Sequence, residues 1–234
     1  GFVDSTFLKD GLINAFTSLG FPVHTENLRT IPLPNTERFG LVSVPHSFIF
    51  LTPEHPPEKV DQLLFAEPVL LTGLARNGFL HVRAPSGYLG WVHNSAITTV
   101  DRDTWRLWHS KQRILIDREM KWASVHVSPG VELPVRDGEL LLPDHSTIPI
   151  PDGLEPHDTS QAAKRRRQIV AVAERFLGTE YVWAGRHIDG IDCSGFVQAV
   201  YGAEGIYLPR DADQQHLCGR ISGTPDWPED LAPA

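Results

Sequence analysis

Short apolar runs separated by turn residues dominate the middle of this chain. Between Leu41 and Val100 the runs LVSVPHSFIFL, EPVLLTGLA, GFLHVRAP, GYLGWVH and SAITTV are broken by Gly, Asn, Pro and Ser. Strands of this length with such turns predict a small, strongly bent all-β barrel over residues 41–110. The block WASVHVSPGVELPVRDGELLLPDHSTIPIP repeats the pattern with Pro-Gly and Asp-Gly turns, and it predicts a second, reduced barrel over 111–152.

A helical period occurs at both ends of the chain. In FLKDGLINAFTSLGF the apolar residues recur near every 3.6 positions, and the Pro-rich TIPLPNTERFG follows, so residues 1–40 are expected to form a short helix and an extended arm. Residues 153–160 form a predicted linker. In QAAKRRRQIVAVAERFLG one face carries apolar residues and Gly178 marks the expected helix end; the face residues are Ile169, Val172, Ala173 and Phe176.

A second C-terminal helix is predicted to begin at Cys193. Its inward face would carry Phe196, Val197, Val200 and Tyr201. Between the two helices lies TEYVWAGRHIDGID, which is rich in aromatic residues and glycine. A loop of this kind carries function more often than packing does.

Composition and charge exclude several classes of protein. The chain has 234 residues, 41% of them hydrophobic and 21% charged, which is ordinary for globular domains. A net charge of -8 argues against binding nucleic acid through the whole surface, and the basic run KRRRQ reads as a solvated helix face. No run reaches the roughly 18 apolar residues of a membrane span, and no signal peptide is visible. The compartment stays open between cytoplasm and cell envelope.

Only two cysteines occur, Cys193 and Cys218, and they fit neither a disulfide framework nor a CxxC or His-rich metal spacing. Cys193 stands at the first turn of a predicted helix, where free N–H groups favour the anionic form in which a thiol attacks. Gly195 would let another backbone approach closely. The alternative is a small buried hydrophobic residue at a helix start.

The stretch YVWAGRHIDGIDCSGFVQAVYGAEGIYLPRDADQQ resembles the NlpC/P60 family of bacterial cell-wall cysteine peptidases. The resemblance rests on a Tyr-x-Trp-x-Gly loop, then Asp-Cys-Ser-Gly-Phe, then Gly-Ile-x-Leu-Pro-Arg-Asp followed by Gln. It implies a papain-like α+β domain over 161–234, and SH3-like modules before it. The hairpin pattern NGFLHVRAPSGYLGWV is itself similar to the core of bacterial SH3-like modules. Where the family usually has two glycines after the Trp, this chain has Ala184 and Gly185.

The resemblance also implies roles for particular residues. Cys193 would be the nucleophile, Asp192 and Ser194 would receive the free amine of a substrate that begins with L-alanine, and Tyr181 and Tyr88 would line the pocket. Each has a structural alternative. Asp192 could only cap the helix, Ser194 could be first-turn filler, and Tyr181 and Trp183 could be core aromatics. Arg210 and Asp211 are expected to pin the loop after the helix through structural hydrogen bonds.

A cysteine nucleophile of this type needs a general base, normally His. The family places that His several tens of residues after the Cys, whereas this sequence stops 41 residues after Cys193. We therefore expect either a fragment whose C-terminal portion is supplied elsewhere or a truncated relative without turnover. His187 and His216 lie nearest in sequence, but neither occupies the position of the base, and surface or capping roles are expected for both.

Two functions follow from these features. The first is a peptidase that cleaves the γ-D-glutamyl to diaminopimelate bond of murein stem peptides with a free N-terminal L-Ala, a reaction that requires no metal or cofactor. The second is a non-catalytic protein whose SH3-like modules bind cell-wall peptides beside a peptidase remnant. The 74 residues from 161 to 234 are few for a papain-like domain, so the apolar face of its helix pair would need cover from elsewhere.

Overall fold

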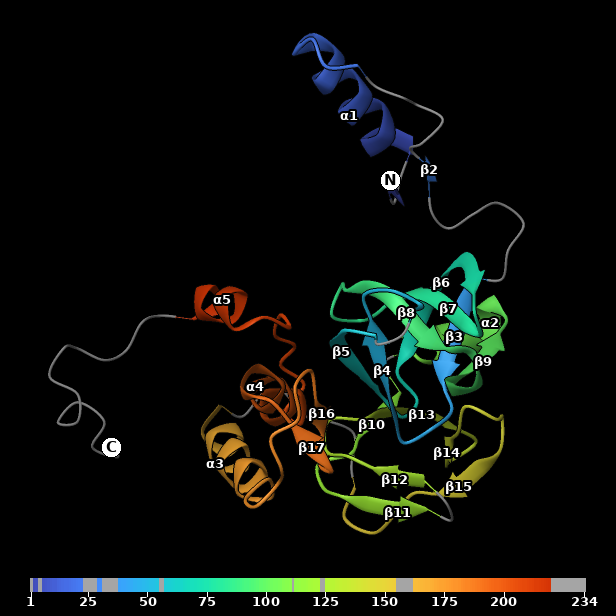
Figure 1. Cartoon of the computed structure of the whole chain (residues 1–234). Helices are drawn as coiled ribbons and strands as arrows, with labels where there is room; N and C mark the ends of the chain where they lie inside the picture. The colour runs from blue at the N-terminus through green and yellow to red at the C-terminus, as the bar shows by residue number, and fades with distance from the viewer. Residues whose placement is uncertain are drawn as a thin grey trace, which may run out of the picture.

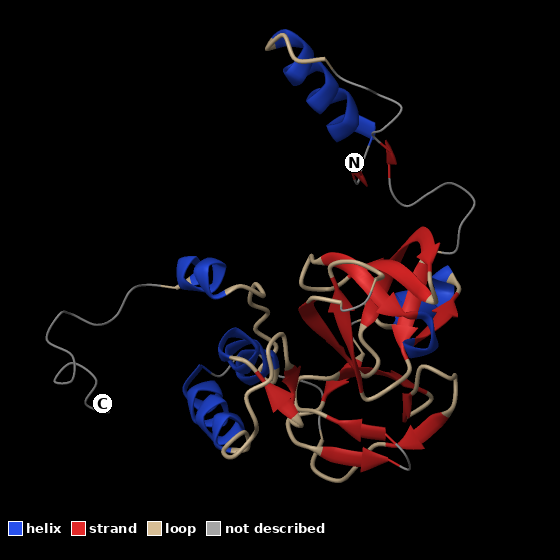
Figure 2. Cartoon of the chain, in the orientation of Figure 1, coloured by secondary structure: helices blue, strands red, loops and turns tan. Residues whose placement is uncertain are grey.

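The computed structural model describes residues 2–3, 6–22, 29–30, 38–54, 57–110, 112–122, 125–154 and 162–219. After an N-terminal helix the chain forms a β-rich body, C-terminal helices follow, and these helices lie beside the β-rich body (Figures 1 and 2). None of the helices in the described part of the chain is both long and apolar enough to cross a membrane.

The first β region, residues 39–100, is one bent antiparallel sheet in the order β5-β4-β8-β7-β6-β3-β9. Its strands are β3 Phe39–Val42, β4 His46–Phe50, β5 Lys59–Leu64, β6 Pro68–Arg76, β7 Phe79–Arg83, β8 Leu89–His93 and β9 Ile97–Val100. The predicted hairpin is confirmed, since β7 pairs with β8 from Phe79–His93 to Arg83–Leu89. The turn into β7 is Asn77-Gly78, whose φ angles of 52° and 81° suit a two-residue hairpin turn.

The second β region, residues 113–149, is smaller. Strands β10 Arg113–Leu115, β13 Glu132–Arg136, β14 Glu139–Leu141 and β15 Thr147–Pro149 form one sheet, and β11 Met120–Trp122 pairs with β12 Val125–Val127. The Asp137-Gly138 turn predicted from the sequence joins β13 to β14. Helix α2, Arg102–Leu107, belongs to the connection between the regions, and the short helix η2, Asn94–Ala96, lies between β8 and β9 of the first region.

The two β regions share a hydrophobic core. Leu41 and Leu64 of the first region belong to one buried cluster with Ile114, Leu133 and Leu140 of the second. A separate cluster fills the first sheet, with Val42, Ile49, Leu63, Val82 and Val92 among its fully buried members. The regions are therefore packed as one body through side chains that alternate along the strands.

The N-terminal helix is also present. Helix α1, Thr6–Ser18, lies beside the short parallel strands β1 Phe2–Val3 and β2 Arg29–Thr30, apart from the β-rich body (Figure 1). The Pro-rich arm predicted after it falls largely on residues 31–37, outside the described residues, as does most of the predicted linker at 153–160.

The C-terminal part, residues 162–219, is mainly helical. It contains α3 Ala162–Glu174, β16 Arg186–His187, β17 Gly190–Ile191, α4 Cys193–Gly202, α5 Ala212–Gln215 and η3 His216–Cys218. Residues of the predicted faces meet in one cluster, which includes Val172 of α3, Phe176 just after the end of α3, and Val200 of α4. The prediction for Tyr201 is wrong, because that side chain is exposed, and Ala199 takes the inward position instead. The side chains of the basic run fall outside the described residues.

Candidate active site

Cys193 is the first residue of α4, and its side chain is exposed. Asp192 is the N-cap, with extended backbone angles of φ -101° and ψ 179°, and its Oδ1 accepts a hydrogen bond from the N–H of Gly195 at 2.7 Å. This is the usual way in which an Asp satisfies a free donor at a helix start. Asp192 therefore caps α4, and the adjacent thiol of Cys193 is exposed at the helix N-terminus.

The loop before α4 packs tightly against the first turn of the helix. The N–H of Asp192 donates to the carbonyl oxygen of Gly185 at 3.1 Å, and a Cβ added at Gly195 would collide with that same oxygen. Glycine is thus required at 195 by close approach of two backbones. Ala184 has a φ of 64°, which lies in the left-handed region that favours glycine.

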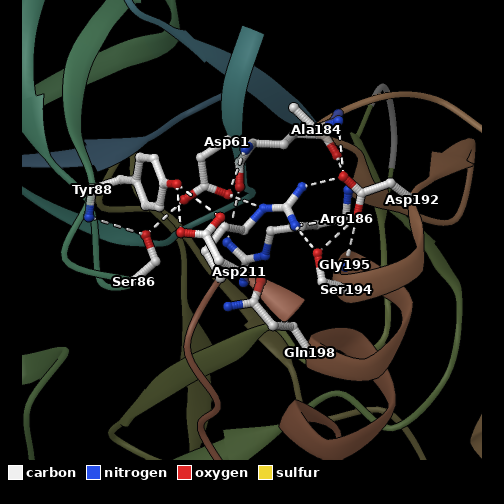
Figure 3. A network of polar contacts seen from close by, with 12 residues as sticks. Asp61, Ser86, Tyr88, Ala184, Arg186, Asp192, Ser194, Gly195, Gln198 and Asp211 are labelled. Carbon is white, nitrogen blue, oxygen red and sulfur yellow. Dashed lines mark hydrogen bonds and ion pairs between the residues drawn. The ribbon is translucent and has the colours of Figure 1, made fainter. Parts of the chain in front are cut away.

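The carboxylate of Asp192 is buried and fully engaged (Figure 3). Beyond the capping bond, its Oδ2 accepts from the N–H of Ala184 at 2.9 Å, and both oxygens accept from the guanidinium of Arg210. Arg210 Nη1 also donates to Ser194 Oγ at 2.7 Å. Both predicted amine ligands, Asp192 and Ser194, thus point into a buried network around Arg210, and their role at a substrate stays a prediction.

Arg210 ties this network to the first β region. Its Nε donates to Asp61 Oδ1 at 2.9 Å, and Asp61, on β5, is completely buried. The other oxygen of Asp61 accepts from Ser86 Oγ at 2.6 Å. The expected structural role of Arg210 is confirmed. The sequence did not lead us to predict the contribution of Asp61. The signal that could have indicated it is the polar pair Asp-Gln inside the otherwise apolar stretch VDQLL, because polar residues in such a stretch need partners when they are buried.

Tyr88 reaches the C-terminal part from the first β region. Its hydroxyl donates to the carboxylate of Asp211, at 2.7 and 2.8 Å from the two oxygens (Figure 3). Burial, followed by the hydrogen bond to Asp211, raises the pKa of Tyr88 to about 12. The hydroxyl therefore remains a donor across the neutral range.

The aromatic residues of the loop are not core residues. The exposed fractions of Tyr181 and Trp183 are 65% and 66%, so the core alternative for both is wrong. Trp183 Nε1 donates to the carbonyl oxygen of Lys59 at 3.1 Å, and this bond anchors the loop to β5. Tyr181 forms a backbone bridge with Ile191 while its ring faces solvent.

The two nearby histidines lie in very different places. His216 is exposed at the start of η3, as expected. His187 is completely buried, so a surface or capping role is wrong. Its ring is 4.7 Å from the ring of His46 and 5.2 Å from that of His126, centroid to centroid. The fold holds His187 among residues of both β regions.

A cavity of about 270 Å³ lies on another side of α4, where the three parts of the chain meet. Trp108, Arg113, Arg186, Gln198 and Tyr207 are among the residues that line it, and Cys193 and Tyr88 are not. The candidate site is therefore the solvent-facing surface at the start of α4 and not this cavity.

The sequence of this chain is similar to those of known proteins. Residues 178–227 match the NlpC/P60 family. The gamma-D-glutamyl-L-lysine dipeptidyl-peptidase of Bacillus subtilis is 25% identical over 185 residues, which cover 68% of this chain and 58% of that protein. Dipeptidyl-peptidase 6 of Lysinibacillus sphaericus is 25% identical over 189 residues, 70% of this chain and 69% of that protein. The chain thus spans a little more than half the length of the first relative.

A solved structure shows the same architecture. An NlpC/P60 family protein from Bacillus cereus superimposes with a TM-score of 0.63 at 18% identity, over 80% of this chain and 79% of that one. A β-rich region precedes an α+β domain, as predicted. Residues 178–227 thus match the NlpC/P60 family in sequence, and the described chain resembles a solved member of that family in fold.

Proposed function

We propose that this protein is a cysteine peptidase that cleaves the amide between γ-D-glutamate and the diamino acid of cell-wall stem peptides with a free N-terminal L-alanine. The observation that carries the proposal is the exposed thiol of Cys193 at the first position of a helix whose N-cap, Asp192, is buried and fixed. The names of the relatives, gamma-D-glutamyl-L-lysine dipeptidyl-peptidase among them, support the class of bond.

In this reaction the Cys193 thiolate attacks the carbonyl carbon of γ-D-glutamate, and N–H groups at the start of α4 stabilise the oxyanion. The C–N bond then breaks, the diamino acid leaves as an amine with the proton that the Cys193 thiol gave up, and a thioester remains. Water then adds to the thioester carbonyl, the C–S bond breaks, the L-Ala-γ-D-Glu part leaves as a carboxylic acid, and the second proton of the water restores the thiol. His187 does not serve as the base, because its ring is buried among His46, His126 and Asp189.

Recognition of the substrate amine is assigned to the acidic and hydroxyl groups beside Cys193. Asp192 and Ser194 already form hydrogen bonds with Arg210. They would therefore attract the substrate amine mainly through the negative charge of the carboxylate and the dipole of the hydroxyl group. Tyr88 and its partner Asp211 supply a further carboxylate that is partly accessible. Tyr181 and Trp183 offer exposed rings against which the peptide would pack.

We also propose that the first β region is an SH3-like module over residues 41–110 and that residues 111–152 form a reduced second module. Short antiparallel strands, the strong bend of the first sheet and the β7–β8 hairpin support the first assignment. The linker at 153–160 and the peptidase domain from 161 complete the proposed organisation.

The test is to incubate the intact gene product with L-Ala-γ-D-Glu-diaminopimelate and to measure release of diaminopimelate. Cleavage should occur, should be lost in Cys193→Ala, and should persist in Cys218→Ser, which removes the other exposed thiol. An N-acetylated substrate should be cleaved at least about tenfold more slowly, since it lacks the cationic amine. Absence of Cys193-dependent cleavage would exclude the peptidase; calorimetric binding of the same peptide without cleavage would then favour the binding protein.

A further inference from the structure

Three imidazoles and a carboxylate gather where the three parts of the chain meet. His46 lies on β4 of the first β region, His126 on β12 of the second, and His187 on β16. Asp189 lies between β16 and β17, three residues before the N-cap of α4. No step of the proposed peptidase reaction uses this cluster, and the spacing of these residues along the sequence gives no hint of it.

The hydrogen bonds of His187 fix its tautomer. Its Nε2 lies 3.2 Å from the carbonyl oxygen of His126, so Nε2 carries the proton and donates. Its Nδ1 accepts from the N–H of Asp189 at 3.1 Å, so Nδ1 carries the lone pair. Asp189 Oδ2 also lies 3.2 Å from that Nδ1. Two electron-rich atoms therefore face each other, which is unfavourable unless a cation or a proton lies between them.

The surroundings of His126 and His187 are those of metal ligands. A ligating His usually donates its second ring N–H to a carboxylate or a backbone carbonyl. His126 Nε2 lies 2.7 Å from Glu119 Oε1 while its Nδ1 lies 3.2 Å from Asp189, and His187 has the carbonyl of His126 in the same role. Each ring thus turns Nδ1 toward the same carboxylate.

His46 supplies a further ligand. One ligand atom each from His46, His187 and Asp189 lie within 4.8 Å of one another. His46 Nδ1 now accepts from Gln62 Nε2 at 3.0 Å, and the orientation of that amide is set because Gln62 Oε1 accepts from the N–H of His187. Coordination through Nδ1 would displace the amide of Gln62. Coordination through Nε2 would place the ring proton on Nδ1, which could then no longer accept from Gln62. His46 is therefore the ligand that must rearrange in either case. At His187 the ion would displace only the N–H of Asp189.

We propose that His46, His187 and Asp189, with His126 beside Asp189, form a binding site for a divalent transition metal of the zinc type. Two ligands bound to one tetrahedral zinc at about 2.0–2.1 Å lie roughly 3.3 Å apart, close to the 3.2 Å between His187 Nδ1 and Asp189 Oδ2. Imidazole and carboxylate ligands suit this class of ion. Asp189, whose side chain is 53% exposed, gives the ion a path from solvent.

The bound ion would act as a cross-link between the three parts. It would join β4 and β12 to the short loop between β16 and β17, and that loop leads directly into Asp192 and Cys193. Its role is to hold the loop, and the thiol chemistry proceeds without it. The proposed metal site can therefore be tested independently of the proposed peptidase activity.

The test uses the untagged full chain with Cys193→Ser and Cys218→Ser, since both exposed thiols would otherwise bind zinc. After treatment with a chelator, Zn²⁺ is titrated by calorimetry and the thermal midpoint is measured with and without it. We expect one Zn²⁺ per chain, a higher midpoint, and Co²⁺ absorption bands of a tetrahedral site. Asp189→Asn should weaken binding by at least about tenfold, and Glu119→Gln, which removes the partner of His126, by about tenfold.

Asp213→Asn is the matched control, because it removes an exposed carboxylate of α5 away from the cluster, and it should bind Zn²⁺ like the parent. Zn²⁺ affinity that is the same in Asp189→Asn and Asp213→Asn would overturn the proposal, as would the absence of a stoichiometric site in the parent. Asp189 is partly exposed, so loss of binding in a variant with an unchanged circular dichroism spectrum cannot come from misfolding.

Discussion

Arg210 neutralises two buried carboxylates that lie far apart in the sequence. Asp61 and Asp192 have exposed side-chain fractions of 0% and 6%, and the guanidinium of Arg210 contacts both. A buried carboxylate without a cation is unfavourable because the low-dielectric interior replaces its hydration poorly. Arg210 therefore supplies the positive charge that balances the N-cap of α4, and two backbone N–H groups, of Ala184 and Gly195, help to hold it in place.

Substitution of Arg210 by Met should lower the free energy of unfolding by about 3–5 kcal/mol, the usual effect of leaving buried charges unpaired. Arg210→Lys should be destabilising by a smaller amount, since it keeps the charge but loses the planar fork that serves both carboxylates. Urea unfolding measures the effect. Arg106→Met is the control, because its ion pair with Asp103 is largely exposed and contributes about 0.5 kcal/mol or less. Equal losses for Arg210→Met and Arg106→Met would contradict the assignment.

Local residue roles could be predicted from the sequence, and distant pairings could not. The cap of α4 by Asp192 spans three residues, so an Asp before an apolar period was enough to indicate it. Asp61 and Arg210 are separated by 149 positions, and His46, His126 and His187 belong to three different strands. Such residues come together only when the three parts of the chain pack against one another. The hydrophobic periodicity of the sequence describes single helices and strands and gives no information about this packing.

At the scale of elements, α4 and the loop at 181–191 form one tightly packed unit. The backbone of Gly195 lies against the carbonyl group of Gly185, and a Cβ at Gly185 would itself collide with the carbonyl oxygen of Gly190. Glycine at these positions lets the loop fold over the first turn of the helix. The helical period predicted the start of α4 at Cys193, whereas α3 ends at Glu174, before the predicted stop at Gly178. The exposure of Trp183 and of Tyr201 was not predicted either, because apolar composition alone does not show which side chains are buried.

Gly195→Ala should therefore separate the loop from the helix. Overpacking against rigid backbone is destabilising by about 1–3 kcal/mol, and the reactivity of the Cys193 thiol toward a soluble alkylating agent should change with the altered first turn. The control is Gly202→Ala in the same helix. A Cβ there meets nothing within 4 Å, so helix propensity alone should stabilise the protein by up to about 1 kcal/mol. Similar effects of the two substitutions on stability would contradict the close-approach argument.

At the scale of the whole molecule, the first β region provides the cover that the helix pair lacks by itself. Strand β16 lies against strand β5. Arg186 of β16 donates a hydrogen bond to the carbonyl oxygen of Gln62 at 2.9 Å and forms an ion pair with Glu67 at 2.9 Å. Trp183 adds its bond to Lys59 on the same strand. The Pro129-Gly130 turn of the second β region approaches the backbone of α4 near Ala199. The C-terminal part is thereby stabilised by contacts that an isolated peptidase segment would not have.

This arrangement makes the C-terminal part dependent on Arg186, whose side chain is only 13% exposed. Replacing Arg186 by Met leaves Glu67, whose side chain is 17% exposed, without its cation, and the loss of stability should lie below the roughly 3–5 kcal/mol of a fully buried pair. Because the lost contacts lie between the parts, amide hydrogen exchange should rise more in α3 and α4 than in the core strands of the first β region. Arg76→Met, which removes an exposed ion pair with Glu54, should leave both patterns unchanged. A uniform rise across both parts would mean that the molecule unfolds as a single unit, and the helices would then not rely on this contact more than the sheets do.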